Sequence, residues 1–242
     1  MIHSMLPLFK VLVLFCSCLM LTISSVRAQD NLFGNWYAWF NNVKFNEKWG
    51  ITNDIQFRAG KNWKENSMFL IRPGINYYVS NTQTASAGYA TTILTSSLSE
   101  GQPRLTEHRI WEQYIITGKI AKIPVQHRFR LEQRFLQRSN EDVFSQRVRY
   151  FIRGIIPLST SLKNPFTAGP FMAIQNELFF NIQNKDKLNG SLFDQNRAYL
   201  ALGYRFSPKY DIELGYMNQF LKRITSPNQF THIAQIAFYT RL

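Results

Sequence analysis

The chain has 242 residues, which is enough for one domain or one mid-sized barrel. It carries 28 Lys and Arg against 15 Asp and Glu, giving a formal net charge of +13. In a soluble protein this charge would point to nucleic acid, but the basic residues stand mostly singly, at alternate positions. Aromatic residues make up 15% of the chain, a high share that is typical of the interfacial girdles of membrane barrels.

Residues 1–28 have the features of a secretory signal peptide. Lys10 supplies a weak positive start, 11–23 are apolar, and Val26–Ala28 forms a small-residue cleavage site. The apolar run is shorter and more isolated than a transmembrane helix. We therefore expect an exported protein with a single mature domain, 29–242, and keep a retained N-terminal anchor as the alternative.

Both cysteines, Cys16 and Cys18, lie inside this segment. A lipoprotein is an alternative because Ser17 precedes Cys18, but the bulky Phe15 and the better cleavage site at Ala28 argue against it. The mature chain then has no cysteine, which excludes a disulfide, a thiolate metal site and a cysteine nucleophile. Export also weakens the case for nucleic acid, and we expect no such partner.

Beyond residue 35, apolar and polar residues alternate in stretches of about ten. In 125–136, Phe129 and Leu131 fall on one parity, whereas Arg130 and Glu132 fall on the other. A period of two is typical of a β-strand, because successive side chains point to opposite faces. An apolar and a charged face, repeated along an exported chain, predict a transmembrane β-barrel with lipid outside and a polar lumen inside.

About eleven such segments are separated by turn residues. In chain order they are 35–41, 48–59, 67–79, 84–95, 104–117, 125–137, 143–156, 170–182, 192–206, 209–222 and 229–242. Short connections alternate with long polar ones, as periplasmic turns alternate with outer loops, and only 159–169 is long where a short one is expected. Because bacterial single-chain barrels have an even number of strands, we expect an all-β antiparallel barrel of about twelve strands. Ten strands, or 31–40 tucked into the lumen, are the alternatives.

The alternation assigns a face to each side chain. In 209–222, Ile212 and Leu214 point outward, whereas Asp211 and Glu213 point inward. The same rule turns these residues of two other segments outward: Trp49, Ile51, Ile55, Phe57, Ala198, Leu200, Leu202, Tyr204 and Phe206.

The segment 104–117 resists this division. Glu107, Arg109 and Gln113 share one parity with the apolar Trp111, whereas Glu112 falls on the other. We therefore expect a β-bulge in this segment.

The last segment is an amphipathic strand that ends at Leu242. Phe230, Ile236 and Phe238 share its apolar parity. Such a strand resembles the signal that the outer-membrane barrel assembly machinery recognises, although an aromatic residue is commoner at the last position. We expect this machinery and outer-membrane lipids as partners, and the outer membrane of a Gram-negative bacterium as the location.

Several motifs occur in a fixed order along the mature chain. They are Glu107–Gln113, Arg128–Arg134, Arg147–Tyr150, Asn176-Glu177, and Phe193–Arg197 followed by Gly203-Tyr204. Together they resemble the domain-of-unknown-function 2490 family of bacterial outer-membrane proteins, common in Bacteroidetes. The resemblance implies a barrel, and because the family's activity is unassigned it implies no catalytic residues.

Charged residues on the inward parity form a ladder across the strands. The ladder comprises Arg128, Arg130, Glu132, Arg134, Arg147, Arg149, Arg153, Glu177, Arg197, Asp211 and Glu213. Neighbouring strands lie about 4.8 Å apart, so these groups reach one another. Two interpretations stay open: the arginines form an anion-selective constriction, or they pair with the carboxylates to fill a narrow lumen.

An enzyme would need a nucleophile and a base. His108 lies beside Glu107 and Glu112, and Ser97 and Ser99 precede it, so a Ser-His-acid lipid hydrolase is one alternative. No spacing selects this triad, and we predict that the protein is not an enzyme. The parity places the other two mature-chain histidines on the lipid side: His127 and His232.

No zinc spacing, phosphate-binding glycine loop or dinucleotide fingerprint is present, so we expect no cofactor and no metal. A polar outer loop explains Asn184–Asp186 better than a calcium site does. Interfacial anchoring explains better than sugar binding a set of aromatic residues near strand ends: Trp36, Trp39, Trp49, Trp63, Tyr77 and Tyr78. We predict a small pore or closed channel with an arginine-rich lumen and an unidentified solute. A structural or envelope-interaction barrel is the alternative.

Overall fold

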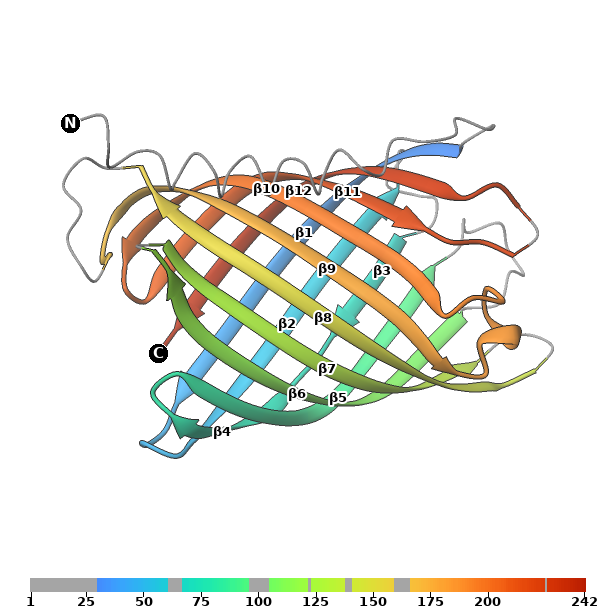
Figure 1. The fold of residues 1–242 in the computed structure, drawn as a ribbon, viewed down its shortest axis with the longest axis horizontal. Helices are drawn as coiled ribbons and strands as arrows, with labels where there is room; N and C mark the ends of the chain where they lie inside the picture. The colour runs from blue at the N-terminus through green and yellow to red at the C-terminus, as the bar shows by residue number, and fades with distance from the viewer. Residues whose placement is uncertain are drawn as a thin grey trace.

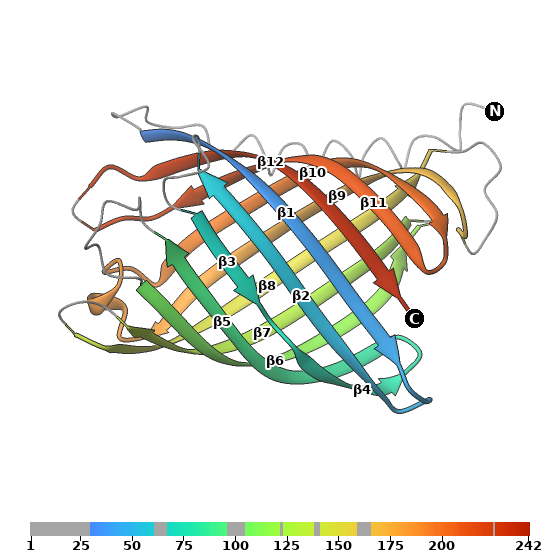
Figure 2. The ribbon, with the colours of Figure 1, turned by 180° about the vertical axis from the view of Figure 1, so that it is seen from behind.

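The computed structural model describes residues 30–60, 67–95, 105–121, 123–137, 141–158, 166–224 and 226–242. These residues form one twelve-stranded sheet that closes on itself as a barrel (Figures 1 and 2). The predicted all-β barrel of about twelve strands is confirmed. The expected signal peptide, with both cysteines, lies outside the described residues. No described helix is long and apolar enough to cross a membrane.

The strands follow one another around the wall and tilt strongly to the barrel axis (Figure 1). They are β1 (Asp30–Lys44), β2 (Trp49–Gly60), β3 (Ser67–Ile71), β4 (Gly74–Ser80), β5 (Gln83–Thr95), β6 (Leu105–Ile120), β7 (Ile123–Gln137), β8 (Val143–Pro157), β9 (Gly169–Gln183), β10 (Phe193–Ser207), β11 (Tyr210–Leu221) and β12 (Gln229–Arg241). A short 3-10 helix, Lys185–Lys187, lies between β9 and β10.

The predicted segment 67–79 is divided into β3 and β4, which lie in line between β2 and β5. The break falls at Arg72 and Pro73, where proline has no N–H to give to a ladder. The ladder nevertheless continues, because Arg72 N donates to Asp54 O at 2.9 Å and Tyr89 N donates to Pro73 O at 3.1 Å. Twelve strands therefore occupy eleven places around the wall.

An odd number of places makes the first and last strands run in the same direction. β1 pairs with β12 in parallel, from Asp30 opposite Gln229 to Asn42 opposite Arg241, and every other pairing is antiparallel. β1 belongs to the wall over its whole length, so the alternative that 31–40 tucks into the lumen is wrong. The parallel pair closes the described barrel without a free edge.

The two ends of the barrel differ. At one end most connections are short turns, such as 45–48 and 208–209, the connection 158–168 between β8 and β9 is longer, and the C-terminus also lies at this end (Figures 1 and 2). The other end carries longer connections, such as 184–192 and 222–228. We call these the short-turn end and the loop end. Most of the predicted exception at 159–169 lies outside the described residues.

The two faces of the wall differ as the alternation predicts. On β11, Leu214 is 65% exposed, whereas its neighbour Glu213 is 1% exposed. Leu202 on β10, the cross-strand partner of Leu214, is 64% exposed. The outside is therefore apolar, and the charged side chains are inside.

The bulge expected in 104–117 is absent from this part of the described structure. β6 keeps an unbroken register with β5 and with β7. Trp111 faces the lumen and is 1% exposed, whereas Glu112 lies on the outer face and accepts a hydrogen bond from Gln133 at 3.2 Å. The pleat is thus regular, and the prediction failed because it expected an aromatic side chain to point outward.

Candidate functional site

Inward-facing charged side chains crowd the lumen. Twelve arginines face it: Arg58, Arg72, Arg109, Arg128, Arg130, Arg134, Arg147, Arg149, Arg153, Arg197, Arg205 and Arg241. Seven carboxylates face them: Asp54, Glu107, Glu132, Glu177, Asp194, Asp211 and Glu213. The structure places all eleven residues of the predicted ladder inside the barrel. The lumen therefore carries more positive than negative charge.

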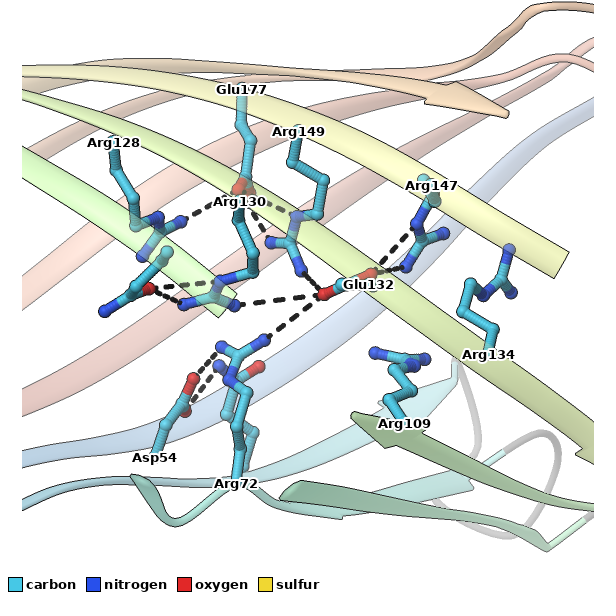
Figure 3. Close-up of polar contacts among 12 residues, drawn as sticks. Asp54, Arg72, Arg109, Arg128, Arg130, Glu132, Arg134, Arg147, Arg149 and Glu177 are labelled. Atoms are coloured by element: carbon cyan, nitrogen blue, oxygen red, sulfur yellow. Dashed lines mark hydrogen bonds and ion pairs between the residues drawn. The ribbon is translucent and has the colours of Figure 1, made fainter. Parts of the chain in front are cut away.

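Glu132 of β7 lies at the centre of the network and is 0% exposed (Figure 3). Arg147 donates to Oε2 through Nε at 3.0 Å and Nη2 at 2.7 Å, and Arg149 Nη1 donates to Oε1 at 2.5 Å. Arg130 and Arg72 bring further guanidinium nitrogens to 3.9 and 4.0 Å from Oε1. Four arginines thus surround one carboxylate.

Two more carboxylates, on β9 and β2, extend this cluster to other parts of the barrel wall. Glu177 Oε1 of β9 accepts from Arg149 Nη2 at 2.7 Å and from Arg128 Nη2 at 2.8 Å. Asp54 of β2 pairs with Arg72 and accepts from Gln56 Nε2 at 2.7 Å. Because Arg149 and Arg72 each contact two carboxylates, the ion pairs join into one layer across the lumen (Figure 3).

The remaining carboxylates pair nearer the two ends. Toward the loop end, Glu107 accepts from Arg109 Nε at 2.8 Å and from Arg134 Nε at 2.5 Å. Asp194 in the same region accepts from Arg147 Nη1 at 3.0 Å.

Toward the short-turn end, Asp211 binds Arg205 Nε at 2.9 Å and Arg241 Nη2 at 2.6 Å. Glu213 pairs with Arg153 and accepts from Tyr239 Oη at 3.2 Å. Each described lumen carboxylate therefore has an arginine partner.

Aromatic side chains fill the space between the charges. Phe179 is 0% exposed, and the guanidinium carbons of Arg149, Arg197 and Arg147 lie 4.4, 4.7 and 5.1 Å from its ring centroid. Trp111 lies under Arg130 at 5.1 Å. The layer around Glu132 is thus packed with rings as well as ion pairs.

The described residues line a larger and a smaller cavity of the barrel. The larger, of about 720 Å³, is lined by residues of the short-turn end and by the near side of the charged layer, including Lys44, Arg241 and Arg149. The smaller, of about 330 Å³, is lined at the loop end by residues that include Arg134. Neither is lined by Glu132. The packed layer around this residue separates the two cavities.

The larger cavity is strongly cationic. Ten basic residues line it: Lys44, Arg58, Arg72, Arg128, Arg130, Arg149, Arg153, Arg197, Arg205 and Arg241. Among the described residues, two side-chain carboxylates line it, those of Asp54 and Glu177. Rings of arginine attract anions, so this cavity has the electrostatics of an anion site.

The predicted ladder left out eight of these lumen residues: Asp54, Arg58, Arg72, Glu107, Arg109, Asp194, Arg205 and Arg241. In the segment 67–79, Arg72 has the same parity as Leu70 and Asn76, which are also buried. The alternation along this segment therefore indicates that Arg72 points into the barrel. Arg205 lies on β10 and Arg241 on β12. The alternation along each of these strands places both side chains inward.

Two of the aromatic residues predicted as interfacial anchors lie elsewhere. Trp36 and Tyr78 line the larger cavity, whereas Trp39, Trp49 and Tyr77 are exposed on the outer face. The prediction for Trp36 and Tyr78 is therefore wrong, because both occupy inward positions of the pleat. Trp63 lies outside the described residues.

The three histidines among the described residues all lie on the outer face, and each contacts a tyrosine of the neighbouring strand. His108 Nδ1 lies 2.5 Å from the Tyr89 hydroxyl. The corresponding distance is 2.9 Å from His127 Nδ1 to Tyr150 and 2.6 Å from His232 Nδ1 to Tyr216. Ser97 and Ser99 lie outside the described residues. Among those described, no group of three His, Cys, Asp or Glu could hold a metal ion.

These features define a closed β-barrel with an apolar exterior and a charged, largely ion-paired lumen. The chain belongs to the family described as protein of unknown function DUF2490, which matches residues 33–231. It is also similar to an uncharacterized protein of Methylorubrum extorquens, with 25% identity over 231 residues that cover 94% of this chain and 97% of the relative.

Proposed function

We propose that the protein is an outer-membrane barrel of a Gram-negative bacterium, exported with residues 1–28 as a cleaved signal peptide. The outer face supports this placement, because Leu200, Leu202 and Leu214 are 51%, 64% and 65% exposed there, which suits lipid better than water. In this placement the short-turn end faces the periplasm and the loop end faces outward. Lipids then cover the apolar belt, and the assembly machinery recognises β12.

A charge placed on this belt tests the placement. We expect Leu214→Arg to lower the free energy of unfolding in phosphatidylcholine vesicles by about 2–4 kcal/mol, because an arginine on the lipid face lacks water. Leu192→Arg, in the exposed loop before β10, should cost less than about 1 kcal/mol. Urea titrations followed by tryptophan fluorescence measure both. Equal effects of the two substitutions would argue against a lipid-facing belt.

Within this membrane, we propose that the protein is a small anion channel that the layer around Glu132 holds closed. The cationic cavity below that layer is the observation that carries the proposal. Anions enter it from the short-turn end, and passage requires the ion pairs of Arg149 to open. The lumen needs no cofactor for this role.

Single-channel recording in a planar bilayer under a salt gradient tests the channel. We expect the wild type to open rarely, with anion preference, and Arg149→Ala to open more often with weaker preference, because Arg149 joins Glu132 to Glu177. Lys185→Ala, on the exposed 3-10 helix at the loop end, is the control and should behave as the wild type. If Arg149→Ala changes only thermal stability, the proposed channel is wrong.

That result would favour the second candidate, a structural or envelope-interaction barrel without transport. The pairing of every described lumen carboxylate with arginine is the observation that favours it. Buried charges of a narrow barrel must pair whether or not it conducts.

We also propose that the barrel is not a lipid hydrolase. A catalytic histidine is oriented by an acid at the ring nitrogen opposite the nucleophile. Nδ1 of His108 instead contacts the Tyr89 hydroxyl. An altered phospholipid or lipid A profile in cells that overproduce the protein, reversed by His108→Ala, would overturn this proposal.

A further inference from the structure

Two arginines of the larger cavity have no carboxylate partner within 4 Å among the described residues. Arg58 of β2 donates to Gln56 Oε1 through Nε at 2.9 Å and Nη2 at 2.6 Å, and Nη1 approaches the sulfur of Met68 at 3.6 Å. In Arg197 of β10, Nε is buried and has no hydrogen-bond partner in the part of the chain that the structure describes. Burying a charge without a counter-charge is costly, so both positions need another anion.

Both arginines lie against the same indole. The guanidinium carbon of Arg58 lies 3.9 Å from the ring centroid of Trp36, and that of Arg197 lies 5.0 Å from it. All three side chains line the cavity. Two like charges at one ring repel each other, and one anion that contacts both would remove this repulsion.

A third arginine that lines the cavity also has an unsatisfied nitrogen. Arg130 is 5% exposed, and its Nη1 has no hydrogen-bond partner among the described residues. The distance of 3.9 Å to Glu132 Oε1 is too long for a hydrogen bond. Its other nitrogens donate to Gln113 Oε1 at 3.1 and 2.5 Å. Arg130 therefore keeps a buried nitrogen that no described residue satisfies.

The cavity has the size and lining of a small-molecule site. Its volume of about 720 Å³ falls within the roughly 300–1,000 Å³ of ligand pockets. Phe151, Ile155 and Met217 give it an apolar wall. Lys44 and Arg241 line it near the short-turn end and would attract anions from that side.

We propose that this cavity binds a phosphate monoester with a small apolar or aromatic body, and that Arg58 and Arg197 together hold the phosphate. A phosphate monoester carries nearly two negative charges at neutral pH, which match two guanidinium groups that have no carboxylate within 4 Å among the described residues. The guanidinium fork also fits phosphate oxygens. Arrival from the periplasmic side rests on the function proposed above, whereas binding itself does not.

Calorimetric titration of phenyl phosphate into the purified barrel in maltoside micelles tests the site. We expect saturable binding by the wild type that Arg58→Gln and Arg197→Gln each weaken about tenfold or more, the loss expected for a charged hydrogen bond. Lys222→Gln, which removes a cation from the loop-end cavity, should bind as the wild type. Arg197→Gln breaks no described ion pair, so gel mobility before and after boiling should show it folded.

Adding phosphatidic acid, a lipid whose headgroup is a phosphate monoester, to the micelles distinguishes the sources of the phosphate group. Competition with phenyl phosphate would indicate a lipid headgroup, and undisturbed binding would indicate a soluble ester. Absent binding by the wild type, or equal binding by all three variants, overturns the proposal. A barrel that binds phenyl phosphate but never conducts would refute the channel and leave this site in place.

Discussion

Replacing Glu132 with glutamine is expected to lower the free energy of unfolding by about 3–5 kcal/mol, the cost of removing one partner from a buried ion-pair network. Glu132 is fully buried and accepts three hydrogen bonds from Arg147 and Arg149. Without its charge, those two guanidinium groups face Arg130 and Arg72 with no anion between them. Their repulsion then adds to the lost hydrogen bonds.

Urea titration in micelles, followed by tryptophan fluorescence, measures this loss. Glu141→Gln is the control, because Glu141 pairs with Lys187 at the loop end and both side chains are more than half exposed; we expect a change below about 1 kcal/mol. A loss of similar size in both variants would mean that Glu132 does not organise the layer. Unchanged stability of Glu132→Gln alone would mean the same.

The inward set of charges was predictable because a strand has only two faces. Once Leu214 and Ile212 point outward, Asp211 and Glu213 must point inward, and a slip of one residue would expose every apolar side chain. The same reasoning holds for the whole predicted ladder. The local sequence therefore predicts the face of each of these charged side chains.

The partners within the lumen were not predictable in the same way. Arg128 on β7 reaches Glu177 on β9, and Arg153 on β8 reaches Glu213 on β11. These contacts pass over one and two intervening strands, and they depend on the curvature and stagger of the closed barrel. Neither quantity can be derived from the alternation along a single strand.

The way in which the sheet closes into a barrel could not be predicted from the sequence pattern either. Eleven segments are visible in the sequence, but the division of 67–79 at Arg72-Pro73 and the parallel pairing of β1 with β12 depend on how the sheet closes. The wrong prediction of a bulge in 104–117 has a related cause. Trp111 fits inside only because glycines on two neighbouring strands leave room for its ring, and that juxtaposition exists only in the folded sheet.

Trp111→Ala is the second substitution for which we expect a large loss, about 3–5 kcal/mol of unfolding free energy, the range for removing a buried aromatic side chain. Trp111 is 1% exposed, and its indole covers Gly74 and Gly88. A Cβ at Gly74 would lie 2.4 Å from the indole, and one at Gly88 would lie 2.5 Å from it. The ring therefore replaces the side chains that these glycines lack, and nothing nearby can fill its volume.

Gel mobility over a urea series measures this loss without relying on the removed fluorophore. Trp49→Ala is the control, because Trp49 lies on the outer face and is 48% exposed; a comparable loss there would contradict the packing argument. Gly88→Ala, tested alone and together with Trp111→Ala, separates two causes. If its cost falls once the indole is gone, the ring excludes the methyl group. If its cost stays the same, the Pro73 carbonyl oxygen, 2.2 Å from that Cβ, excludes it instead.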